Sequence, residues 1–422
     1  MPADINTTPY DIAIIGGGLV GTSLALALDG LGLRVTLLEA TDSATTTPPG
    51  FDERTLALNW GSRQVLDAIG AWRSIEPIAH SIHRLHVSNV GHCGVTRLDR
   101  GLIGRPALGY VVPADELGSA LNRQIQENSA IEYRGATVCD RVEGVDQHVL
   151  IKCSTSSLQI KARVVVLADG GRSSLRQQFR LDIRDQPYNQ SVLVTTVETN
   201  RVHGQLAYER FTTDGPLALL PLNERYYALA WTLPRERAPV IAASPKTDFV
   251  DHLQQVFGDR AGRFLCCTRR RVFPLTLTDV PNAAANRCIA IGNAAHVMHP
   301  VAGQGLNLGL RDVAELAERL HNTHRRGGDI GSDAFLADYV AARRTQTRRV
   351  LGFTDGLVRL FSSERRGVSL TRNLALNLLD GAVPVKRALL RRTTGLAGRL
   401  PRLARGLPLR DDVVSTRHAG DL

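Results

Sequence analysis

Lysine is scarce in this chain of 422 residues: four of its 51 basic residues are lysine and the other 47 are arginine. Such uniform use of arginine indicates a GC-rich coding sequence before it indicates a binding surface. Aromatic residues are also few, at 5%. A nucleic-acid-binding surface needs basic residues clustered with exposed aromatic side chains. We therefore expect no nucleic-acid partner, despite a net charge of +10.

Cysteine pairs at the spacing of metal or redox sites are absent. The six cysteines include no C-x-x-C pair, which argues against a zinc site or a redox dithiol. Scattered cysteines of this kind are typical of a protein in a reducing cytoplasm. His296 and His299 are three residues apart but have no acidic residue or cysteine nearby in the sequence, so we expect no metal.

Long uncharged hydrophobic runs and a leader are absent as well. The N-terminus lacks the positively charged region of a signal peptide. The apolar stretch 12–33 is interrupted by six glycines and Asp29, and no later segment reaches the roughly 18 apolar residues of a membrane span. We therefore expect no membrane-spanning helix.

The composition that remains is ordinary for a globular protein, with 43% hydrophobic and 22% charged residues. Residues 10–15 and 34–38 have the pattern of strands buried on both faces, and 19–31 that of the helix between them. We expect further buried strands at 163–167 and 288–291, a β-meander at 131–160, other strands within 80–112 and 188–233, and helices at 59–69, 115–127, 249–257, from about 305 to 320, and in most of 332–422.

These elements predict a mixed α/β (α+β) fold, in which a Rossmann-like nucleotide-binding domain is interrupted twice by a β-sheet substrate domain. We place the nucleotide-binding domain at 1–78, 108–182 and 268–345. The β-sheet domain takes 79–107 and 183–267, and a helical, basic C-terminal region takes 346–422.

A glycine-rich motif follows the first strand. Gly16-Gly-Gly18-Leu-Val-Gly21 matches G-x-G-x-x-G and opens the first helix. Gly16 permits the tight turn, Gly18 lets the backbone approach a pyrophosphate, and Gly21 allows close packing of helix on strand. Glu39, at the end of the second strand, is placed to bond an adenosine ribose hydroxyl. The motif alone does not separate NAD from FAD.

Two more segments carry chemistry. The strand 163–167 leads into Asp169-Gly170, which places a carboxylate at the edge of the sheet where ligands bind. The strand 288–291 leads into Gly292-Asn293, and a loop with Pro300, Gly303 and Gly305 follows. A helix begins directly after that loop, so its N-terminus points back toward a ligand.

Together the three segments resemble the aromatic-ring hydroxylases, single-component flavoprotein monooxygenases similar to p-hydroxybenzoate hydroxylase. The resemblance extends to about residue 360. Segments 51–58, 215–221 and 299–307 look like the ubiquinone-biosynthesis branch, and 86–92 with Gly292-Asn293 looks most like its 2-polyprenyl-6-methoxyphenol hydroxylases. Most of the wider family has Gly-Asp at 292–293. Asn293 departs from that pattern, but its amide can still bond a ribityl hydroxyl.

The resemblance implies FAD as the cofactor. It places Gly16, Gly18, Gly21 and Glu39 at the adenosine and pyrophosphate and Arg54 along the pyrophosphate and flavin. It also implies that Asp169 and Gly170 serve FAD and the pyridine nucleotide. The ribityl chain and the ring would be held by Gly292, Asn293, Gly303, Gly305, Leu306 and Asn307.

The resemblance further implies that electrons come from NAD(P)H and that O2 is a co-substrate. A C4a-hydroperoxide of the flavin would deliver one oxygen atom to an electron-rich polyprenylated phenol. By resemblance, the loop with Pro300, Gly303 and Gly305 forms one wall of this catalytic site, and the inserted sheet forms the other. No side-chain base can be named from the sequence. The partners implied are the enzymes of a ubiquinone-biosynthesis complex.

Other functions remain open on the sequence alone. Another FAD-dependent phenol hydroxylase or a reductase of isoprenoid double bonds would use the same fold. A flavin halogenase is expected to carry an extra lysine near its tunnel, and the four lysines here lie outside the flavin motifs. A non-enzymatic nucleotide-binding regulator is the remaining class.

The C-terminal segment 381–410 has eight basic residues, no acidic ones, and leucines interleaved with them. A basic, leucine-bearing helical segment is typical of a peripheral contact with an anionic membrane surface. We therefore expect a cytoplasmic protein attached to a membrane surface. The alternative is a tail that packs on partner proteins or on an acidic face of the protein itself.

Overall fold

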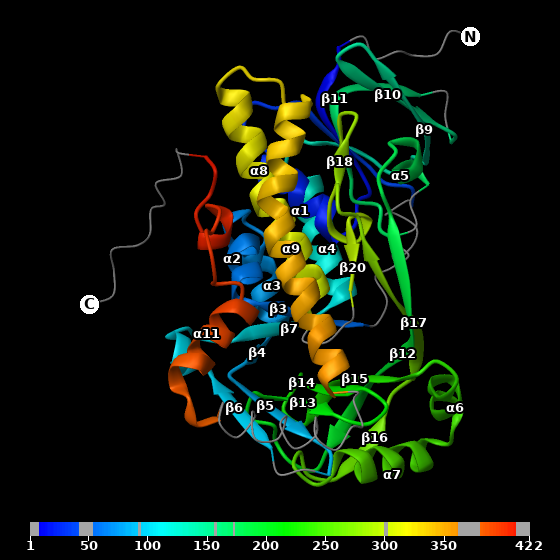
Figure 1. Ribbon diagram of the computed structural model, residues 1–422, viewed down its shortest axis with the longest axis vertical. Helices are drawn as coiled ribbons and strands as arrows, with labels where there is room; N and C mark the ends of the chain where they lie inside the picture. The colour runs from blue at the N-terminus through cyan, green and yellow to red at the C-terminus, as the bar shows by residue number, and fades with distance from the viewer. Residues whose placement is uncertain are drawn as a thin grey trace.

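A parallel sheet lies at the end of the molecule that carries the N-terminus (Figure 1). The computed structural model describes residues 8–41, 54–91, 94–155, 158–171, 174–298, 303–361 and 380–410. Five of the eight strands run parallel, in the order β19-β11-β1-β2-β8, with β18 at one edge and the hairpin β9–β10 added to β11. The bounds are β1 Tyr10–Ile15, β2 Val35–Leu38, β8 Glu132–Arg134, β9 Cys139–Val145, β10 His148–Cys153, β11 Gln159–Leu167, β18 Ala284–Ala285 and β19 Cys288–Ala290.

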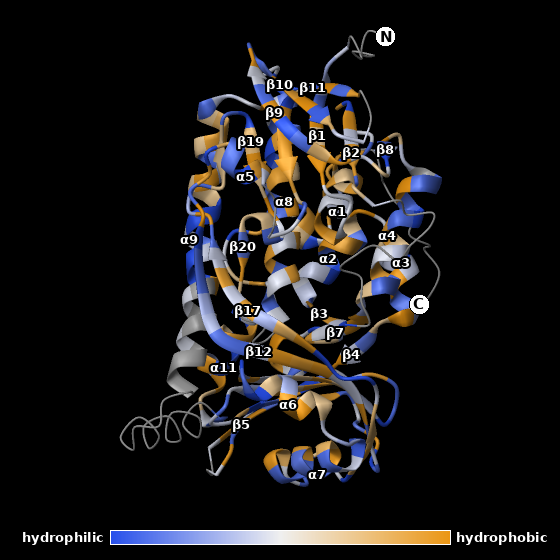
Figure 2. Cartoon of the chain, turned by 90° about the vertical axis from the view of Figure 1, so that its right-hand side faces the viewer, coloured by the Kyte–Doolittle hydropathy of each residue, from blue (hydrophilic) through white to orange (hydrophobic). Residues whose placement is uncertain are grey.

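These strands are hydrophobic on both faces because both faces are covered. Figure 2 shows hydrophobic residues gathered along β1 and the strands beside it. Ile12 and Ile14 pack into one core with the helices, and Ala13 and Ile15 into a second core on the opposite face. The helices around the first core are α1 Leu19–Leu28, α2 Trp60–Ala68, α3 Trp72–Ile75, α4 Ala114–Asn128, α8 Gln304–Arg325 and α9 Asp333–Phe361; the short α5 Leu175–Gln178 lies beside the second.

A nine-stranded sheet forms the other end of the molecule (Figure 1). Its order is β20-β17-β12-β15-β14-β13-β5-β6, and β16 also pairs with β12. One face packs on α6 Arg237–Ala243 and α7 Lys246–Phe257 through residues such as Trp231 and Phe249. The strands are β5 Arg84–Asn89, β6 Val95–Asp99, β12 Arg184–Thr199, β13 Leu206–Phe211, β14 Pro216–Pro221, β15 Tyr226–Pro234, β16 Phe264–Cys267, β17 Arg271–Asp279 and β20 His296–Val297.

A small sheet joins the two ends. Its order is β3-β7-β4, with β3 Thr55–Asn59, β7 Gly109–Pro113 and β4 His80–Ile82. The strands β12 and β17 also run from the larger sheet toward the parallel sheet (Figure 1). The opposite face of the nine-stranded sheet, free of α6 and α7, is thereby held against the carboxyl ends of the parallel strands.

The mixed α/β fold predicted from the sequence is confirmed. The exact domain boundaries stay a prediction, although β17 joins the nine-stranded sheet and lies beyond the boundary predicted at 268. The β-meander predicted at 131–160 is wrong in its first strand: β8 pairs with β2 in parallel, whereas β9, β10 and the start of β11 are consecutive antiparallel strands. A three-residue strand at a sheet edge carries too little pattern to reveal its partner.

The C-terminal segment 380–410 packs on the protein itself. It contains α11 Val383–Thr393 and a short turn of helix at Leu403–Arg405. Leu390, Leu403 and Leu409 are buried in the protein's hydrophobic cores. These leucines stabilise the fold, so they do not form the apolar face that contact with a lipid surface needs.

Charged partners hold the same segment in place. Arg410 donates from Nε to the carbonyl oxygen of Asp29 over 3.0 Å, and Lys386 pairs with Asp380 over 3.0 Å. Among the described residues, no helix is long and apolar enough to cross a bilayer. Association with a membrane surface stays a prediction; the segment 381–410 on which it was based lies within the described residues.

Candidate functional site

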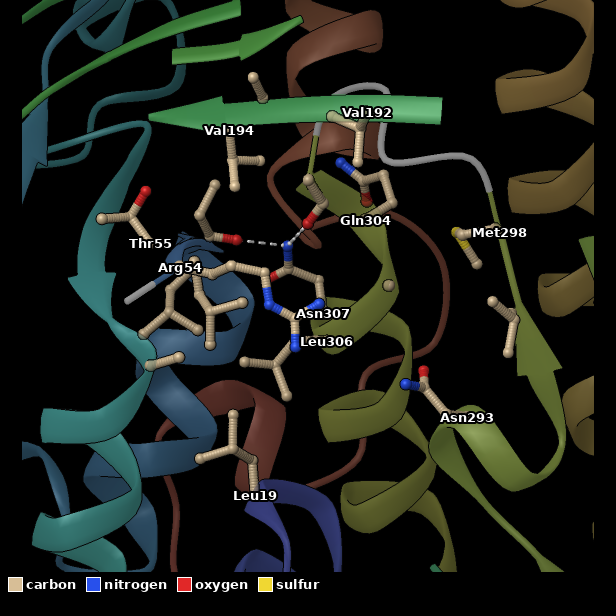
Figure 3. A pocket seen from close by; sticks show the side chains of 18 of the residues that line it. Leu19, Arg54, Thr55, Val192, Val194, Asn293, Met298, Gln304, Leu306 and Asn307 are labelled. Atoms are coloured by element: carbon tan, nitrogen blue, oxygen red, sulfur yellow. Dashed lines mark hydrogen bonds between the residues drawn. The ribbon is translucent and has the colours of Figure 1, made fainter. Parts of the chain in front are cut away.

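A cavity of about 1030 Å³ lies between the parallel sheet and the nine-stranded sheet. Single-ligand sites are commonly about 300–1000 Å³, so this cavity has room for more than one small molecule. Figure 3 shows that side chains from β3, β12 and the first turn of α8 converge on it, with Asn293 and Met298 across from them. Several segments far apart in the chain therefore build one site.

The glycine-rich loop forms the wall of the cavity at the N-terminus of α1. Gly16, Gly18 and Leu19 line the cavity, and no side chain caps the helix there. Glu39 accepts a hydrogen bond from the backbone N–H of Gly17 over 2.6 Å and from Thr41 over 2.9 Å. Glu39 thus ties the loop to the end of β2 and lines the cavity; its predicted bond to a ribose stays a prediction.

The N-terminus of α8 forms a second wall. Gly303 precedes the helix in a left-handed conformation, with φ of 59°, and no side chain caps the helix. Gly303, Gly305 and Leu306 line the cavity, and Asn293 reaches into it from the turn after β19. The first turns of α1 and α8 contain no acidic residue. Two uncapped helix N-termini therefore offer free N–H groups and partial positive charge to the cavity.

Asn307 lines the cavity, and its predicted contact with the cofactor stays a prediction. Its Oδ1 accepts hydrogen bonds from the backbone N–H of Asn59 over 2.8 Å and from the hydroxyl of Ser62 over 2.6 Å. Its Nδ2 donates to the carbonyl oxygens of Ala57 and Gly303 over 2.8 and 2.6 Å (Figure 3). All four hydrogen-bonding capacities of the amide are thus used by the protein. The side chain of Asn307 therefore positions the loop before α8 against β3 and α2.

The remaining predicted residues lie at the same cavity, with one exception. Arg54, Asp169, Gly170 and Asn293 line it, and the Arg54 guanidinium stacks 4.8 Å from the ring centre of Phe273. Gly292 and Gly21 lie directly behind the lining residues. Pro300 lies outside the described residues. The structure thus brings the three predicted motifs together, while their contacts with a cofactor stay a prediction.

A buried ionic cluster supports the turn that carries Asn293. Asp312, on α8, accepts hydrogen bonds from the backbone N–H of Gly292 over 3.0 Å, from His296 Nε2 over 2.6 Å and from Arg343 Nε over 2.7 Å. Burial alone would raise the pKa of Asp312, but Arg343, His296 and the Gly292 N–H lower it to about 2. His296 is therefore paired with a carboxylate. Among the described residues, no group of metal-ligating side chains gathers here or elsewhere.

The nine-stranded sheet gives the cavity an apolar half. Its lining there includes four alanines and several larger hydrophobic residues: Ala207, Ala218, Ala228, Ala230, Leu85, Val87, Leu98 and Leu220. Leu389 and Leu390 of α11 close the same region. Glu209 is the one acidic side chain in this lining away from the glycine-rich loops.

Sequence reasoning did not single out Glu209. The strand Leu206–Phe211 is buried at nearly every position, so both of its faces are covered. Burial of a charge is costly, so a single carboxylate in a strand that is covered on both faces indicates a ligand-binding site.

The residues present fit FAD. An ideal Cβ at Gly18, at Gly170 or at Gly305 meets no atom of another described residue within 4 Å, so open space faces the backbone at each loop. Two helix N-termini are directed at that space, which suits a pyrophosphate at α1 and the negative charge of a reduced flavin ring at α8. Arg54 adds a cation to the same half of the cavity.

Replacing Asn293 by Ala is expected to weaken FAD binding by about 1–3 kcal/mol, the usual scale for losing one hydrogen-bond partner of a buried polar group. The side chain projects into the cavity and is exposed there. Asn293→Asp keeps an acceptor and is expected to bind FAD normally. Fluorescence titration of the apoprotein with FAD measures both. Equal losses in the two variants would contradict a hydrogen bond from this side chain to the ribityl chain.

Comparisons with known proteins agree on one family. A model of the family described as "FAD binding domain" matches residues 9–354. Ubiquinone hydroxylase UbiL of Rhodospirillum rubrum is 35% identical over 406 residues, which cover 94% of this chain and 93% of that protein. The 3-demethoxyubiquinol 3-hydroxylase of Escherichia coli is 29% identical over 392 residues, covering 92% and 99%.

Solved structures agree on the fold. The p-nitrophenol 4-monooxygenase PnpA from Pseudomonas putida superimposes with a TM-score of 0.75, covering 93% of this chain and 99% of that chain. Its sequence is 18% identical, so this likeness concerns the fold alone.

Proposed function

We propose a function for this chain from the premise that it belongs to the FAD binding domain family and, within it, to the ubiquinone-biosynthesis hydroxylases. The chain is an FAD-dependent hydroxylase, and we propose that it hydroxylates the aromatic ring of a polyprenylated phenol. NAD(P)H is the proposed source of electrons and O2 the proposed source of the added oxygen atom.

One observation carries this proposal: the apolar half of the cavity adjoins the loop before α8. Val192 and Val194 of β12 line the cavity beside Gln304, and the four alanines of the nine-stranded sheet continue from there. Small side chains leave room for a ring in front of the sheet. An aromatic substrate lying against this sheet is therefore next to the place where the flavin ring is expected.

The apolar lining extends beyond the size of a single ring and supports a prenyl tail. Leu85 and Leu98 of the sheet and Leu389 and Leu390 of α11 continue the lining, and Leu102 belongs to the same hydrophobic cluster. Burial of isoprenoid groups against such residues contributes about 25 cal/mol per Å² of apolar area. A hydrophilic phenol would gain nothing from this part of the cavity.

Bound FAD would supply the oxygen activation, which side chains cannot perform. The chain's own residues bind the pyrophosphate at α1, place the ring at the N-terminus of α8, and keep water from the apolar half of the cavity. The form of the activated oxygen stays a prediction.

The test is a reconstitution of the purified protein with FAD, NADH or NADPH, and 2-geranylphenol under 18O2. We expect a product with one added hydroxyl that carries the 18O label. Consumption of NAD(P)H without labelled product, or reduction of a prenyl double bond, would reject the proposed hydroxylation.

Filling the space in front of the alanines is expected to stop hydroxylation and leave FAD bound. Ala218 lines the cavity and pairs with Glu209 on one side and Ala230 on the other, and Ala218→Phe places a ring where the substrate ring is expected. We expect turnover of 2-geranylphenol to fall at least a hundredfold with unchanged flavin content. Ala218→Ser adds a single oxygen atom and serves as the control, with activity within a few fold of wild type. Normal turnover by the Phe variant would place the substrate elsewhere.

A further inference from the structure

Glu209 points into the cavity from the centre of the nine-stranded sheet. Along β13, Ala207, Glu209 and Phe211 line the cavity. The residues between them face the other side of the sheet: Tyr208 packs with Phe257 of α7, and Arg210 stacks on the same ring. The alternation of a strand therefore fixes the direction of the Glu209 side chain.

The Glu209 carboxylate is nine-tenths buried and has no polar partner. Glu209 is 9% exposed. No hydrogen bond or ion pair joins its side chain to another of the described residues. A buried acid without a partner destabilises a fold, because ionising it requires the removal of water that nothing replaces. Such a group persists where a ligand completes its surroundings.

Within the described part of the chain, no charged neighbour faces Glu209 from the elements packed around it. The flanking strands present Leu85 and Val87 from β5 and Ala218 and Leu220 from β14, and α11 presents Leu389, Leu390 and Thr393. The charged residues near β13 that could titrate with it, His86 and Arg210, face the opposite side of the sheet. The other charged side chains of the cavity lie with the flavin loops or on β17 and the residues before it: Glu39, Arg54, Asp169, Arg269 and Arg271.

The register of the sheet places Glu209 about one substituted aromatic ring away from the loop before α8. Glu209 pairs with Ala218, Ala218 with Ala230, and Ala230 with Val194. These three steps of about 4.8 Å separate Glu209 from Val194 by roughly 14 Å across the sheet. Val194 lies two residues along β12 from Val192, and Figure 3 shows Val192 beside Gln304 at the start of α8. The gap holds one substituted aromatic ring over the alanines, with its hydroxyl toward Glu209 and its far edge toward the flavin.

We propose that the Glu209 carboxylate binds the ring hydroxyl of the phenol substrate and accepts its proton. This inference rests on the proposed function and names its proton acceptor. The O–H bond of the phenol breaks, its electron pair stays on the phenolate oxygen, and the proton moves to a Glu209 oxygen. The phenolate is richer in electrons at the ring carbon to be hydroxylated.

The proton balance closes over one turnover. O2, NAD(P)H and one proton from solvent are consumed, and the hydroxylated ring, NAD(P)+ and one water are formed. The water carries the second oxygen atom and takes up the proton that the ring carbon loses. When the ring regains aromaticity, the hydroxylated carbon loses its hydrogen as a proton, and the original ring oxygen takes its own proton back from Glu209. Glu209 ends the cycle as the carboxylate it was at the start.

Burial raises the pKa of Glu209 to about 7. A phenol has a pKa of about 10, and an ordinary glutamate has a pKa of about 4.3. Burial therefore reduces the difference in pKa between the phenol that donates the proton and the Glu209 carboxylate that accepts it. Matched pKa values make proton transfer faster. In the empty site both the charged and the neutral form of Glu209 are therefore populated near neutral pH, and binding of a phenol favours the charged form.

Calorimetry tests the proposal without turnover. We use FAD-loaded protein, 2-geranylphenol, and its methyl ether, in buffers of different ionisation enthalpy at pH 7. Wild type is expected to release a fraction of a proton on binding the phenol, because its carboxyl must ionise, and to bind the phenol at least tenfold more tightly than the ether. Glu209→Gln is expected to release none.

Turnover gives the second measurement. An amide accepts the hydroxyl hydrogen bond but not the proton, so Glu209→Gln is expected to lower kcat a hundredfold or more with little change in KM. The fall of wild-type kcat below about pH 7 should disappear in this variant. Glu209→Leu, which also removes the hydrogen bond, should raise KM and erase the preference for the phenol over the ether. Glu198→Gln, in the same sheet but outside the cavity lining, is the control and should behave as wild type.

The outcomes separate this inference from the proposed function. A wild-type kcat and pH profile in Glu209→Gln, alongside labelled product from wild type, overturns the role of Glu209 and keeps the hydroxylation. Absence of phenol binding and of labelled product in wild type overturns both. Unchanged flavin content in every variant confirms that the losses come from the substrate half of the cavity.

Discussion

Gly18→Val protein is expected to fold and to contain no FAD. An ideal Cβ at Gly18 meets no atom of another described residue within 4 Å, so the apoprotein accommodates a side chain there. The same space borders the uncapped N-terminus of α1, where the pyrophosphate must approach the backbone. A valine would occupy that approach. The flavin absorbance of the purified protein measures the loss, and thermal unfolding of the apoprotein measures the fold.

Gly21→Val is the matched comparison within the same loop. A Cβ at Gly21 would lie 1.9 Å from the carbonyl oxygen of Gly16, so this variant should lose the packing of α1 on β1 and fail to fold. The two glycines thus separate a cofactor contact from a packing contact. Full FAD occupancy in Gly18→Val would show that the pyrophosphate lies elsewhere.

Asp312→Asn is expected to destabilise the protein by about 3–5 kcal/mol, because it leaves the Arg343 guanidinium buried without its counter-charge. Arg343 is 5% exposed and Asp312 is 2% exposed. The variant also weakens the hydrogen bond that the Gly292 N–H donates to residue 312. We therefore expect the affinity for FAD to fall as well as the stability. Urea unfolding measures the first effect and FAD titration the second.

A surface pair provides the control for this charge. Asp338 of α9 pairs with Arg319 of α8, but the Asp338 side chain is 69% exposed. Asp338→Asn should therefore change the free energy of unfolding by no more than about 1 kcal/mol. Asp312→Asn combined with Arg343→Met should recover part of the loss, since no charge is then left unpaired. Equal effects of Asp312→Asn and Asp338→Asn would contradict a role for the buried cluster.

The effect of Asp312→Asn is expected to depend on pH in a defined direction. The pKa of Asp312 falls from an ordinary 3.8 to about 2, so the ionised carboxylate stabilises the fold above about pH 4. This contribution is lost as the pH falls toward 2. The unfolding curves of wild type and variant should therefore differ at pH 7 and approach each other in strong acid.

Sequence reasoning predicted best those elements whose structure is determined by the pattern of residues within the segment itself. The strand predicted at 10–15 has the bounds of β1, because a short run that is apolar except for Asp11 and is followed by glycines has few alternatives. The helix predicted at 115–127 is α4, Ala114–Asn128, whose apolar residues recur at helical spacing. The three motifs meet at one cavity because the carboxyl ends of parallel strands share an edge.

What the sequence did not reveal depends on tertiary pairing. Glu209 resembles any polar residue of a half-exposed strand until β13 is paired between β5 and β14 over the cavity. Asn307 stands in a cofactor motif, yet its amide is fully engaged by β3, by α2 and by its own loop. The leucines of 381–410 have the spacing of a membrane-surface segment, and only the fold shows which of them are core residues.

The packing of the C-terminal segment sets the order in which this enzyme can be completed during synthesis. Arg410 bonds the carbonyl oxygen of Asp29, a contact between residues 381 positions apart. Leu403 and Leu409 fill the core around the first helices, while Leu389 and Thr393 close the cavity. Until residues 389–410 have been synthesised, the core around the first helices is therefore incomplete and the cavity lacks one of its walls. Removal of residues 383–410 by proteolysis would break these contacts and expose the apolar core around the first helices.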